Sequence, residues 1–388
     1  MRILTFTTLY PNAAQPRHGL FVEQRLRQVL RTREIAACVV APVPWFPFRS
    51  PGFGLYAQYA AVPAREQRYG IDVRHPRYLV LPKIGMSVTP WFLARAGMAA
   101  AHRVAEGFDL VDAHYFYPDG VAATLLAQRL RKPVVITARG SDINLLPRFA
   151  LPRRWIRWAA ARAAAIISVS RALKDELVSL GVAASKITVL RNGVDLDFFR
   201  PLERDSARAQ LGWRGRTLLC VGNLLHSKGQ DVAIETLRHL ADTYLVIIGD
   251  GPDRQALESL ARSIGVADRV SFVGGLAQGD LVRYYSAADA LVLPSEREGW
   301  PNVLLEALAC GTPVVTSRVG GSAEIVRAEE AGTLVGERSA AAFADALRRL
   351  FARPPDRTAT RRYAERFGWD EIAFAQRELY RAVLRQAA

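Results

Sequence analysis

The chain has 388 residues, of which 50% are apolar and 23% charged, so it is long enough for two domains with buried cores and is not a disordered or low-complexity chain. Its three cysteines, Cys38, Cys220 and Cys310, lie far apart without metal-ligand spacing, which argues against a disulfide framework and fits a reducing compartment. The net charge of +15 comes from residues 1–200, with 28 Lys and Arg against 13 Asp and Glu, whereas residues 201–388 contain 24 of each.

Strands and helices are predicted to alternate along the whole chain. Helical stretches carry apolar residues at three- and four-residue spacing, the first over about Val22–Arg33. Short apolar runs between them predict strands at Arg2–Thr7, Ile35–Ala41, Leu110–Ala113, Val134–Thr137, Ala165–Val169, Ile187–Leu190, Thr217–Gly222, Tyr244–Gly249, Val270–Val273, Ala290–Leu293 and Pro313–Thr316. Such alternation is typical of parallel sheets covered on both faces, and it occurs twice. We therefore predict an α/β fold with two Rossmann-like, doubly wound parallel-sheet domains.

The break between the domains is predicted near Asn192–Arg208, where polar and charged residues interrupt the apolar periodicity. We expect an N-terminal, acceptor-binding domain over residues 1–197 and a C-terminal, donor-binding domain over residues 198–371. An amphipathic helix over about 372–388 is expected to cross back onto the first domain. Open parallel sheets bind ligands at the carboxyl ends of their strands, so two facing sheets would form a central cleft.

The segment Pro294–Gly321 places two glutamates around the start of a helix. A buried strand ends at Pro294, and the next helix is expected to begin near Pro301, a residue suited to a first helical position. Glu298 lies in the loop and Glu306 on the helix, where one carboxylate can accept bonds from sugar hydroxyls and the other from ribose hydroxyls. The N–H groups near Asn302 and Val303 suit a phosphate. The alternative is two solvated glutamates around an ordinary strand–helix turn.

The surrounding sequence resembles the retaining glycosyltransferases of family 4, which have the GT-B fold. The resemblance rests on Glu298 and Glu306 with seven residues between them, followed by Ala-Leu-Ala-Cys-Gly-Thr-Pro-Val-Val and Val-Gly-Gly-Ser-Ala-Glu. It extends to Val-Gly-Asn-Leu-Leu-His-Ser-Lys-Gly from Val221, Ile-Gly-Asp-Gly-Pro from Ile248 and Asn-Gly-Val-Asp from Asn192. The resemblance implies that Glu298 contacts the transferred sugar and Glu306 the ribose of a UDP- or GDP-linked sugar.

The phosphate-binding residues are the next expectation. Lys228 is the single lysine among residues 201–388, and after a strand and a glycine turn it can neutralise the β-phosphate as the bond to the sugar breaks. The alternative is an ordinary solvated lysine. The resemblance adds Gly222, Asn223 and Gly249 to the nucleotide-binding residues, although many members have Arg where this chain has Asn223. Arg297 or a helix N-terminus would then supply the missing positive charge.

Gly19 follows the first strand, at the end of Thr-Leu-Tyr-Pro-Asn-Ala-Ala-Gln-Pro-Arg-His-Gly. A glycine there lets backbone N–H groups approach a ligand closely at the start of the next helix, or it serves turn chemistry alone. The stretch resembles the branch of the family found in capsule, exopolysaccharide and teichuronic-acid assembly. That resemblance implies a glycine against the donor phosphate and sugar.

Three further residues at predicted strand ends are candidates for the sugar or acceptor site. His114 follows the strand at 110–113, and the family resemblance implies that it hydrogen-bonds the transferred sugar; a satisfied structural histidine is the alternative. Thr-Ala-Arg-Gly-Ser-Asp from Thr137 resembles the family's Thr-x-His-Gly-x-Asp, with Arg139 in place of the usual histidine. Arg139 and Asp142 are therefore candidates for lining the acceptor or sugar site, and a solvated turn is the other interpretation.

The basic first half is expected to contact an anionic membrane or an anionic acceptor, and a core-packed helix with a solvated arginine face is the alternative. Arg153, Arg154 and Arg157 lie beside Trp155 and Trp158 on a predicted helix, which is typical of an in-plane interfacial helix. An aromatic-rich loop over residues 44–53 lies in the same domain. We expect peripheral attachment to the cytosolic face of an anionic inner membrane, or else a cytoplasmic protein, since no run approaches ~18 apolar residues and the N-terminus does not resemble a signal peptide. No nucleic-acid partner is expected, because no nucleic-acid motif accompanies the charge.

The predicted reaction is transfer of a glycosyl group from a nucleoside diphosphate, with retention, to a glycan or lipid-linked acceptor in bacterial surface polysaccharide synthesis. The expected catalytic residues are Glu298, Lys228 and His114, with no metal and no cofactor, because no aspartate pair or His/Asp cluster offers a cation site. Two alternatives remain open. One is another GT-B enzyme, such as a nucleotide-sugar epimerase or a glycan phosphorylase, and the other is a non-catalytic basic scaffold of an assembly complex.

Overall fold

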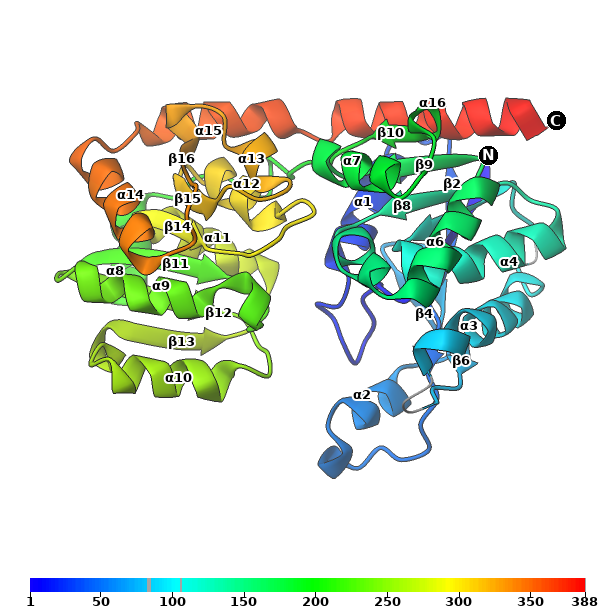
Figure 1. Ribbon diagram of the computed structural model, residues 1–388, viewed down its shortest axis with the longest axis horizontal. Coiled ribbons are helices and arrows are strands. Elements are labelled where there is room, and N and C mark those ends of the chain that lie inside the picture. Colours follow the sequence, from blue (N-terminus) through cyan, green and yellow to red (C-terminus); the bar gives the residue numbers. More distant parts are fainter. Residues whose placement is uncertain (82–84, 105–106, 388) are drawn as a thin grey trace. The chain divides into compact units, whose positions relative to one another are not determined.

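The computed structural model of the protein describes residues 1–81, 85–104 and 107–387. The chain forms two compact units, Met1–Asn192 with Asp370–Ala388 (unit 1) and Gly193–Trp369 (unit 2) (Figure 1). The boundaries between the units lie after Asn192 and after Trp369. The sequence pattern predicted them after residues 197 and 371. The linker joins unit 2 early because Val194 N–H donates to the carbonyl of Phe367 over 2.9 Å.

Unit 1 is built on an eight-stranded sheet with the order β10-β9-β8-β7-β1-β2-β5-β4. Its strands are β1 (Arg2–Phe6), β2 (Ala36–Val40), β4 (Arg65–Arg68), β5 (Ile71–Arg74), β7 (Leu110–His114), β8 (Val134–Ala138), β9 (Ala165–Ser168) and β10 (Ile187–Val189). The predicted strands have ends within one residue of β1, β2, β7, β8, β9 and β10. The antiparallel hairpin β4–β5 was not predicted, because Arg-Glu-Gln-Arg in β4 lacks the apolar run of a buried strand.

Helices cover both faces of this sheet. They are α1 (Leu20–Leu30), α3 (Gly85–Ala101), α4 (Val121–Leu130), α6 (Ala150–Arg162), α7 (Arg171–Ser179) and α16 (Asp370–Ala387), with α5 (Ser141–Asn144) as a single turn. Helices α1 and α16 share one core cluster with the sheet, in which Val22 and Leu26 lie with Tyr380 and Val383. The expected return of the C-terminal helix to the first domain is therefore present. On the other face α3, α4 and α6 pack against one another.

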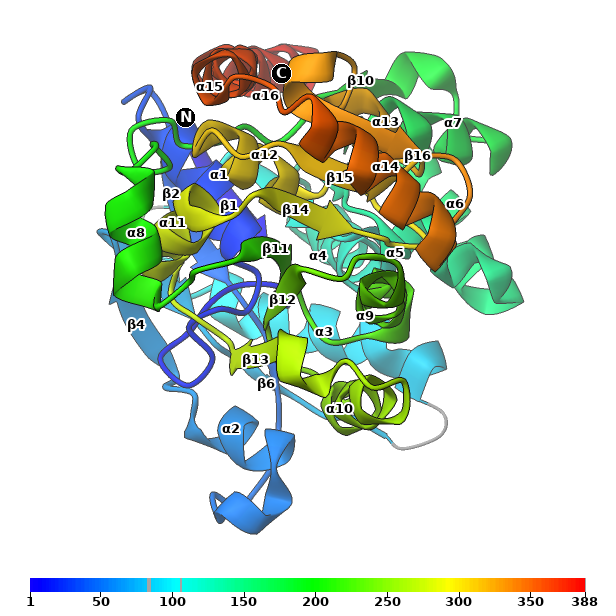
Figure 2. The same ribbon diagram turned by 90° about the vertical axis from the view of Figure 1, so that its left-hand side faces the viewer.

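A second, small sheet joins two segments of unit 1 that lie outside the main sheet. Strand β3 (Val43–Pro44) pairs in parallel with β6 (Arg77–Tyr78). After β3 the chain forms the 3-10 turn η1 (Pro51–Phe53) and helix α2 (Leu55–Ala61), which project away from the main sheet (Figures 1 and 2).

Unit 2 contains a six-stranded parallel sheet with the order β13-β12-β11-β14-β15-β16. The strands are β11 (Arg216–Val221), β12 (Thr243–Ile248), β13 (Val270–Gly274), β14 (Ala290–Leu293), β15 (Val314–Ser317) and β16 (Gly332–Val335). All but β16 match predicted strands within one residue at each end. The helices are α8 (Arg204–Leu211), α9 (Gln230–Thr236), α10 (Arg254–Ser263), α11 (Gln278–Ala287), α12 (Asn302–Ala309), α13 (Ser322–Ile325), α14 (Ala340–Ala352) and α15 (Arg357–Ala364).

Each main sheet has a point where its strand order reverses, and there the carboxyl ends of two strands leave room for a ligand. In unit 1 this point lies between β1 and β7, and in unit 2 between β11 and β14. The predicted site residues Gly19 and His114 follow the first pair, while Lys228 and Glu298 follow the second. No helix among the described residues is long and apolar enough to span a bilayer.

Candidate active site

The loop between β14 and α12 in unit 2 carries Glu298. Helix α12 begins at Asn302, one residue later than predicted. Pro301 is the N-cap with extended backbone and not the first helical residue. The loop is seated on the pair Gly320–Gly321: a Cβ atom at Gly320 would lie 1.9 Å from the carbonyl oxygen of Glu298. Backbone at this distance leaves no room for any side chain at Gly320, so this glycine determines where Glu298 sits.

Lys228 and Glu298, which are far apart in sequence, form an ion pair with Nζ and Oε1 2.7 Å apart. Ser295 Oγ donates to the same carboxylate oxygen, also over 2.7 Å. The two loops meet closely because a Cβ at Gly229 would lie only 2.1 Å from the Pro294 carbonyl oxygen. The Lys228 side chain is 29% exposed and that of Glu298 7%, so the lysine is the more accessible partner of the pair.

Glu306 lies on α12 as predicted, and burial raises the pKa of its carboxyl group to about 7. Tyr285 of α11 donates its hydroxyl to Oε2 over 2.7 Å, which opposes part of that rise. The buried carboxyl is therefore close to half ionised near neutral pH. The sequence offered no signal for Tyr285, because nothing in α11 indicates which helix faces α12.

The glycines at the strand ends of unit 2 have two different roles. Gly249 has φ of 146°, and a Cβ there would lie 1.9 Å from the carbonyl oxygen of Gly222, so it allows two strand ends to approach. Gly222 has φ of 154°, and a Cβ there would meet no atom within 4 Å, which leaves open space beside the backbone. Asn223 is exposed next to that space, and its carbonyl accepts from Gln230.

Two arginines lie near the phosphate-binding residues that the sequence predicted. Arg297, the proposed substitute for the missing family arginine, is partly buried, with Nη1 3.9 Å from a carboxylate oxygen of Glu296. Arg338, which sequence reasoning missed, donates to the Pro294 carbonyl over 2.7 Å and pairs with Asp231 at 3.5 Å. Arg338 therefore fastens the loop after β14, and Arg297 remains the arginine nearer to Glu298 in sequence.

In unit 1, Gly19 is the N-cap of α1 and has φ of 68°. A Cβ atom there would lie 2.3 Å from the carbonyl carbon of Leu9, so a side chain is excluded by both conformation and space. The first role of Gly19 is therefore to allow a tight turn of the backbone. It also brings the start of α1 against the loop that follows β1, where the sequence predicted a phosphate contact.

His114 ends β7 and is buried, with both ring nitrogens engaged inside the protein. Its Nε2 lies 2.9 Å from Oδ2 of Asp112, and its Nδ1 lies 2.6 Å from Nη2 of Arg139. Because burial lowers the pKa of His114 to about 4, the ring is neutral, donates from Nε2 to the carboxylate and accepts at Nδ1. A hydrogen bond to a sugar, as predicted, would require His114 to exchange one of these partners.

The chain of bonds continues through a ring of buried side chains. Asn192 Oδ1 accepts from Arg139 and from Arg25 Nη1, each over 3.1 Å. Arg25 Nε donates to Gln376 Oε1 over 2.6 Å, and the Gln376 amide bonds to the hydroxyl of Tyr380. Tyr380 completes the ring through its electrostatic interaction with the nearby Asp112 carboxylate, which helps to lower the pKa of that group. The ring thus ties α1 and α16 to the carboxyl ends of β7 and β8.

Asp142, the other candidate of unit 1, is buried and accepts three backbone N–H bonds. The donors are Phe116 over 2.8 Å, Gly140 over 2.7 Å and Arg139 over 3.1 Å. This carboxylate holds the turn after β8 in place, and the structure brings it next to Arg139 as a support. Asp119, which sequence reasoning did not select, accepts from the Thr8 N–H, and burial raises its pKa to about 7.

No group of three or more His, Cys, Asp and Glu side chains within residues 1–81, 85–104 and 107–387 is arranged to hold a metal ion. The three cysteines are buried free thiols. The polar groups that the structure gathers at the strand ends are therefore the Lys228–Glu298 pair, Glu306 with Tyr285, and the buried ring of unit 1.

Comparison with known proteins accounts for both units. Residues 203–367 match the family model "Glycosyl transferases group 1", and residues 52–198 match "Glycosyltransferase Family 4". A D-inositol 3-phosphate glycosyltransferase of Xylanimonas cellulosilytica is 34% identical, over 74% of this chain and 75% of its own. The putative teichuronic acid biosynthesis glycosyltransferase TuaC of Bacillus subtilis is 30% identical, over 90% of this chain and 89% of its own.

Solved structures agree on the fold. Sucrose-phosphate synthase of Thermosynechococcus elongatus superposes with a TM-score of 0.82 at 23% identity, over 99% of both chains. Anabaena HepE in complex with UDP and glucose superposes with a TM-score of 0.76 at 21% identity, over 98% of this chain and 100% of that one. With two matched family models and relatives that it covers over most of their length, the chain belongs to the family 4 glycosyltransferases of the GT-B fold.

Proposed function

We propose that the protein transfers a sugar from a nucleoside diphosphate to an acceptor hydroxyl with retention at the anomeric carbon. The observation that carries this proposal is the ion pair of Lys228 with Glu298 at the switch point of the unit 2 sheet. The pair places a partly exposed ammonium next to a carboxylate, which matches the two groups that a sugar phosphate presents: anionic oxygens and hydroxyl donors.

The parts of the donor are assigned to separate residues of unit 2. The open space beside Gly222 is proposed for the diphosphate, together with Lys228 and the N–H groups at the start of α12. Glu298 accepts bonds from the transferred sugar, and Glu306 accepts bonds from the ribose hydroxyls. The structural neighbour HepE, whose structures contain UDP and UDP-glucose, supports a UDP-linked donor at this fold position.

In the proposed mechanism the bond between the anomeric carbon and the β-phosphate oxygen breaks first. The phosphate gains negative charge, and Lys228 stabilises that charge by turning its hydrogen bond from Glu298 to the leaving oxygen. The acceptor oxygen attacks from the face that the phosphate leaves, and the acceptor proton passes to a phosphate oxygen. The configuration is thereby retained, and the positive charge comes from the protein's own groups without a metal ion.

We propose a glycan or lipid-linked acceptor in bacterial surface polysaccharide synthesis, bound by unit 1. The similarity to TuaC supports this class, whereas the similarity to D-inositol 3-phosphate glycosyltransferases supports a small phosphorylated polyol as the second candidate. The cytosolic face of an anionic membrane is the proposed location, since the excess of basic residues lies in the first half of the chain.

The test is a thermal-shift panel of UDP, GDP and ADP and their sugars, followed by analysis of the product formed from the stabilising donor. Binding of a matched donor stabilises the folded protein by mass action, and the product should keep the donor's anomeric configuration. Inversion would refute retention. A requirement for inorganic phosphate would favour a phosphorylase, donor isomerisation without transfer an epimerase, and absence of any nucleotide binding a non-catalytic scaffold.

A further inference from the structure

Three stretches of the chain contain no Asp or Glu: residues 35–65, 73–105 and 143–174. Together they contain 14 Lys and Arg, so they account for nearly all of the net charge of +15. We call them the acid-free segments. Segregation of this kind produces a local positive potential, of which, within the residues that the structure describes, only the charges of Arg65 and Arg74 are offset by ion pairs with Asp72.

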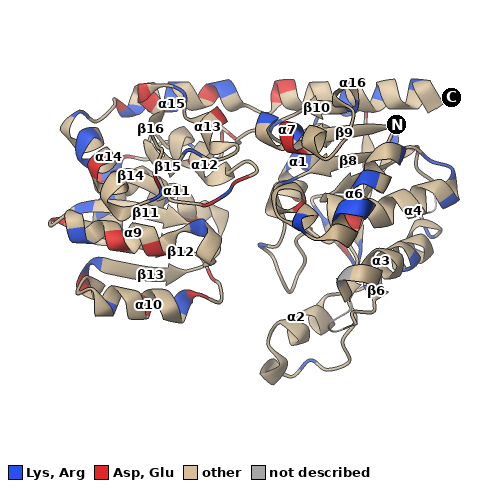
Figure 3. Cartoon of the chain, viewed as in Figure 1, with Lys and Arg blue, Asp and Glu red and all other residues tan. Residues whose placement is uncertain are grey.

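The acid-free segments adjoin one another in unit 1. The first two are joined where Val43 of β3 pairs with Arg77 of β6. The second and third are joined where Trp91 of α3 meets Trp155 of α6 edge to face, with ring centroids 4.7 Å apart. Figure 3 shows the ribbons of these segments in blue and tan. The acid-free segments are therefore neighbours in unit 1, and we treat their exposed parts, from α2 across α3 to α6, as one surface.

This surface also exposes much of the large apolar side-chain area of the described chain. Eleven of the 19 large apolar residues that are most exposed lie in these segments: Trp45, Phe48, Phe53, Leu55, Tyr56, Leu79, Val80, Leu81, Trp91, Phe149 and Leu151. Monomeric soluble proteins rarely expose apolar groups together, so this grouping indicates a surface that contacts another phase or molecule.

The most exposed part is an aromatic cluster in the projecting segment around η1 and α2, which we call the aromatic knob. The ring of Phe46 lies 5.9 Å from that of Phe48, 5.2 Å from Phe53 and 5.2 Å from Tyr56. These rings pack on one another, yet Phe48 remains 56% exposed and Trp45 53%. The single charged residue between 35 and 64 is Arg49. The knob is thus an aromatic projection that carries one positive charge and no negative charge.

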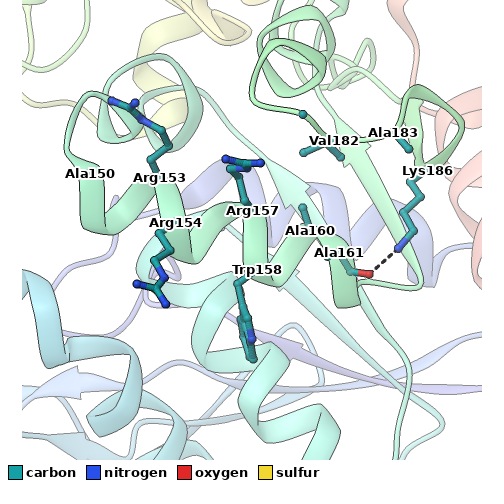
Figure 4. Close-up of a pocket in the computed structure, with 11 residues that line it drawn as sticks. Ala150, Arg153, Arg154, Arg157, Trp158, Ala160, Ala161, Val182, Ala183 and Lys186 are labelled. Atoms are coloured by element: carbon teal, nitrogen blue, oxygen red, sulfur yellow. Dashed lines mark hydrogen bonds between the residues drawn. The ribbon is translucent and has the colours of Figure 1, made fainter.

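Helix α6 supplies the basic part of the surface, beside a hollow of about 750 Å³. Arg153, Arg154, Arg157 and Lys186 line this hollow with Trp158, and no carboxylate lines it (Figure 4). Arg153 and Lys186 donate to backbone carbonyls, whereas in the described part of the chain Arg154 and Arg157 have no hydrogen-bond or ion-pair partner. Two guanidinium groups are therefore available to an anionic ligand.

The tryptophans of α6 differ from the sequence expectation. Trp155 and Trp158 are partly buried, with ring centroids 5.3 Å apart, and they support Trp91 instead of standing free at the border of the helix. The exposed apolar residues at this end are Trp91, Phe149 and Leu151. The packed tryptophan rings thus hold α6 against α3, while the arginines of α6 are exposed.

We propose that the acid-free segments bind the surface of an anionic phospholipid bilayer, with the aromatic knob inserted among the headgroups and Arg153, Arg154 and Arg157 on lipid phosphates. A bilayer provides an apolar region for the aromatic rings and, beside it, lipid phosphates for the guanidinium groups. A second copy of this chain would meet the surface with the same positive charge. The inference rests on the proposed membrane location and not on the transfer chemistry of unit 2.

The test compares the full-length protein on phosphatidylcholine vesicles with and without phosphatidylglycerol. Flotation should require phosphatidylglycerol and weaken with salt, because screening reduces the attraction between charges. The variant R153Q/R154Q/R157Q should bind phosphatidylglycerol vesicles about a hundredfold more weakly, at roughly fivefold per arginine. The variant W45S/F48S/F53S should lose binding to phosphatidylglycerol vesicles even at low salt, because its charge is unchanged but its apolar anchor is removed.

Matched controls keep this test independent of folding and of the donor site. The variant R238Q/R283Q/R349Q removes the same charge from exposed positions of unit 2, and L202S/Y244S removes exposed apolar groups there. Both should bind vesicles like the unchanged protein. All four variants should bind nucleotide equally and unfold at similar temperatures, so loss of membrane binding and failure of the proposed transfer function are separate results.

Three results would overturn the proposal. One is equal binding to neutral and anionic vesicles, and another is equal loss of binding in the matched controls. The third is a different occupant of the surface: self-association in solution that W45S/F48S/F53S abolishes would assign the knob to a second copy, and tight binding of single-stranded oligonucleotides that R153Q/R154Q/R157Q abolishes would assign the arginines to nucleic acid.

Discussion

The candidate residues of the two units satisfy their polar groups in opposite ways. In unit 2, Lys228 and Glu298 pair with each other, and the lysine remains 29% exposed. In unit 1, His114 and Arg139 are buried, and their side chains bond to each other and to the buried residues Asp112 and Asn192. In unit 2, Lys228 can exchange Glu298 for a ligand. In unit 1, the polar groups of His114 and Arg139 are already bonded inside the protein, and we call this site closed.

The difference follows from where the charges lie. A partly exposed ion pair loses little when one partner turns to a ligand phosphate, because water and the ligand compensate the change. A guanidinium in the interior depends on its internal partners, and burial lowers the pKa of Arg139 to about 9. The comparison indicates chemistry at Lys228 and Glu298, and a supporting role for the ring that contains Arg139.

The largest expected effect is on transfer. The substitutions Lys228→Ala and Glu298→Gln should each lower kcat by about 10²–10³, because each removes a group that stabilises charge or orients the sugar in the transition state. Steady-state rates with a matched donor measure this, and circular dichroism should show an unchanged fold. Asp345→Asn, which breaks the exposed pair with Arg348 in unit 2, is the control and should retain full activity.

A smaller effect is expected on stability from the closed site. Arg139→Met leaves His114 Nδ1 without its buried donor and removes one of the donors to Asn192 Oδ1, so it should lower the free energy of unfolding by about 3 kcal/mol. Urea unfolding followed by circular dichroism measures it. Arg171→Met, at an exposed position of α7, should cost little. If both variants are equally stable and Arg139→Met raises only the acceptor KM, the arginine serves the acceptor directly and the comparison fails.

The smallest effect is a pH dependence of donor binding. Ribose hydroxyls donate to an ionised carboxylate, but below pH 7 the raised pKa of Glu306 keeps it protonated in the free protein. Binding must then release a proton, so affinity should fall by up to tenfold per pH unit below about 7. Calorimetry with an intact nucleotide sugar, whose phosphates do not titrate in this range, measures the slope. Glu306→Gln should bind weakly at every pH and show no slope; a retained slope would assign it to another group.

Much of the fold followed from the sequence because parallel strands and helices have strong local signatures. Strands such as Ala290–Leu293 are continuous apolar runs, and these were located to within one residue. In the two main sheets the sequence did not predict β4 and β16, which are edge strands of mixed composition, nor β5, which pairs with β4 in an antiparallel hairpin. An edge strand is covered on fewer sides, so its sequence is less constrained to be apolar.

The site of unit 2 was predictable for a related reason. Lys228 and Glu298 each follow a strand, and the carboxyl ends of neighbouring parallel strands meet at one edge, so sequence position implied proximity. Tyr285 was missed because its contact depends on which face of α11 is turned toward α12, and Arg338 because its contact depends on where the loop between β16 and α14 packs. The spacing of apolar residues within one segment does not specify these contacts between segments.

The sequence by itself determined the family, the two parallel sheets and the strand ends that hold the candidate residues, since these depend on local patterns and on motifs. Only the tertiary structure decided which candidates are open to a ligand. Burial and hydrogen-bond partners come from segments far apart in the chain, as with Gln376 and Arg25 or Gly320 and Glu298. These contacts close the ring around His114 and leave Lys228 accessible beside Glu298.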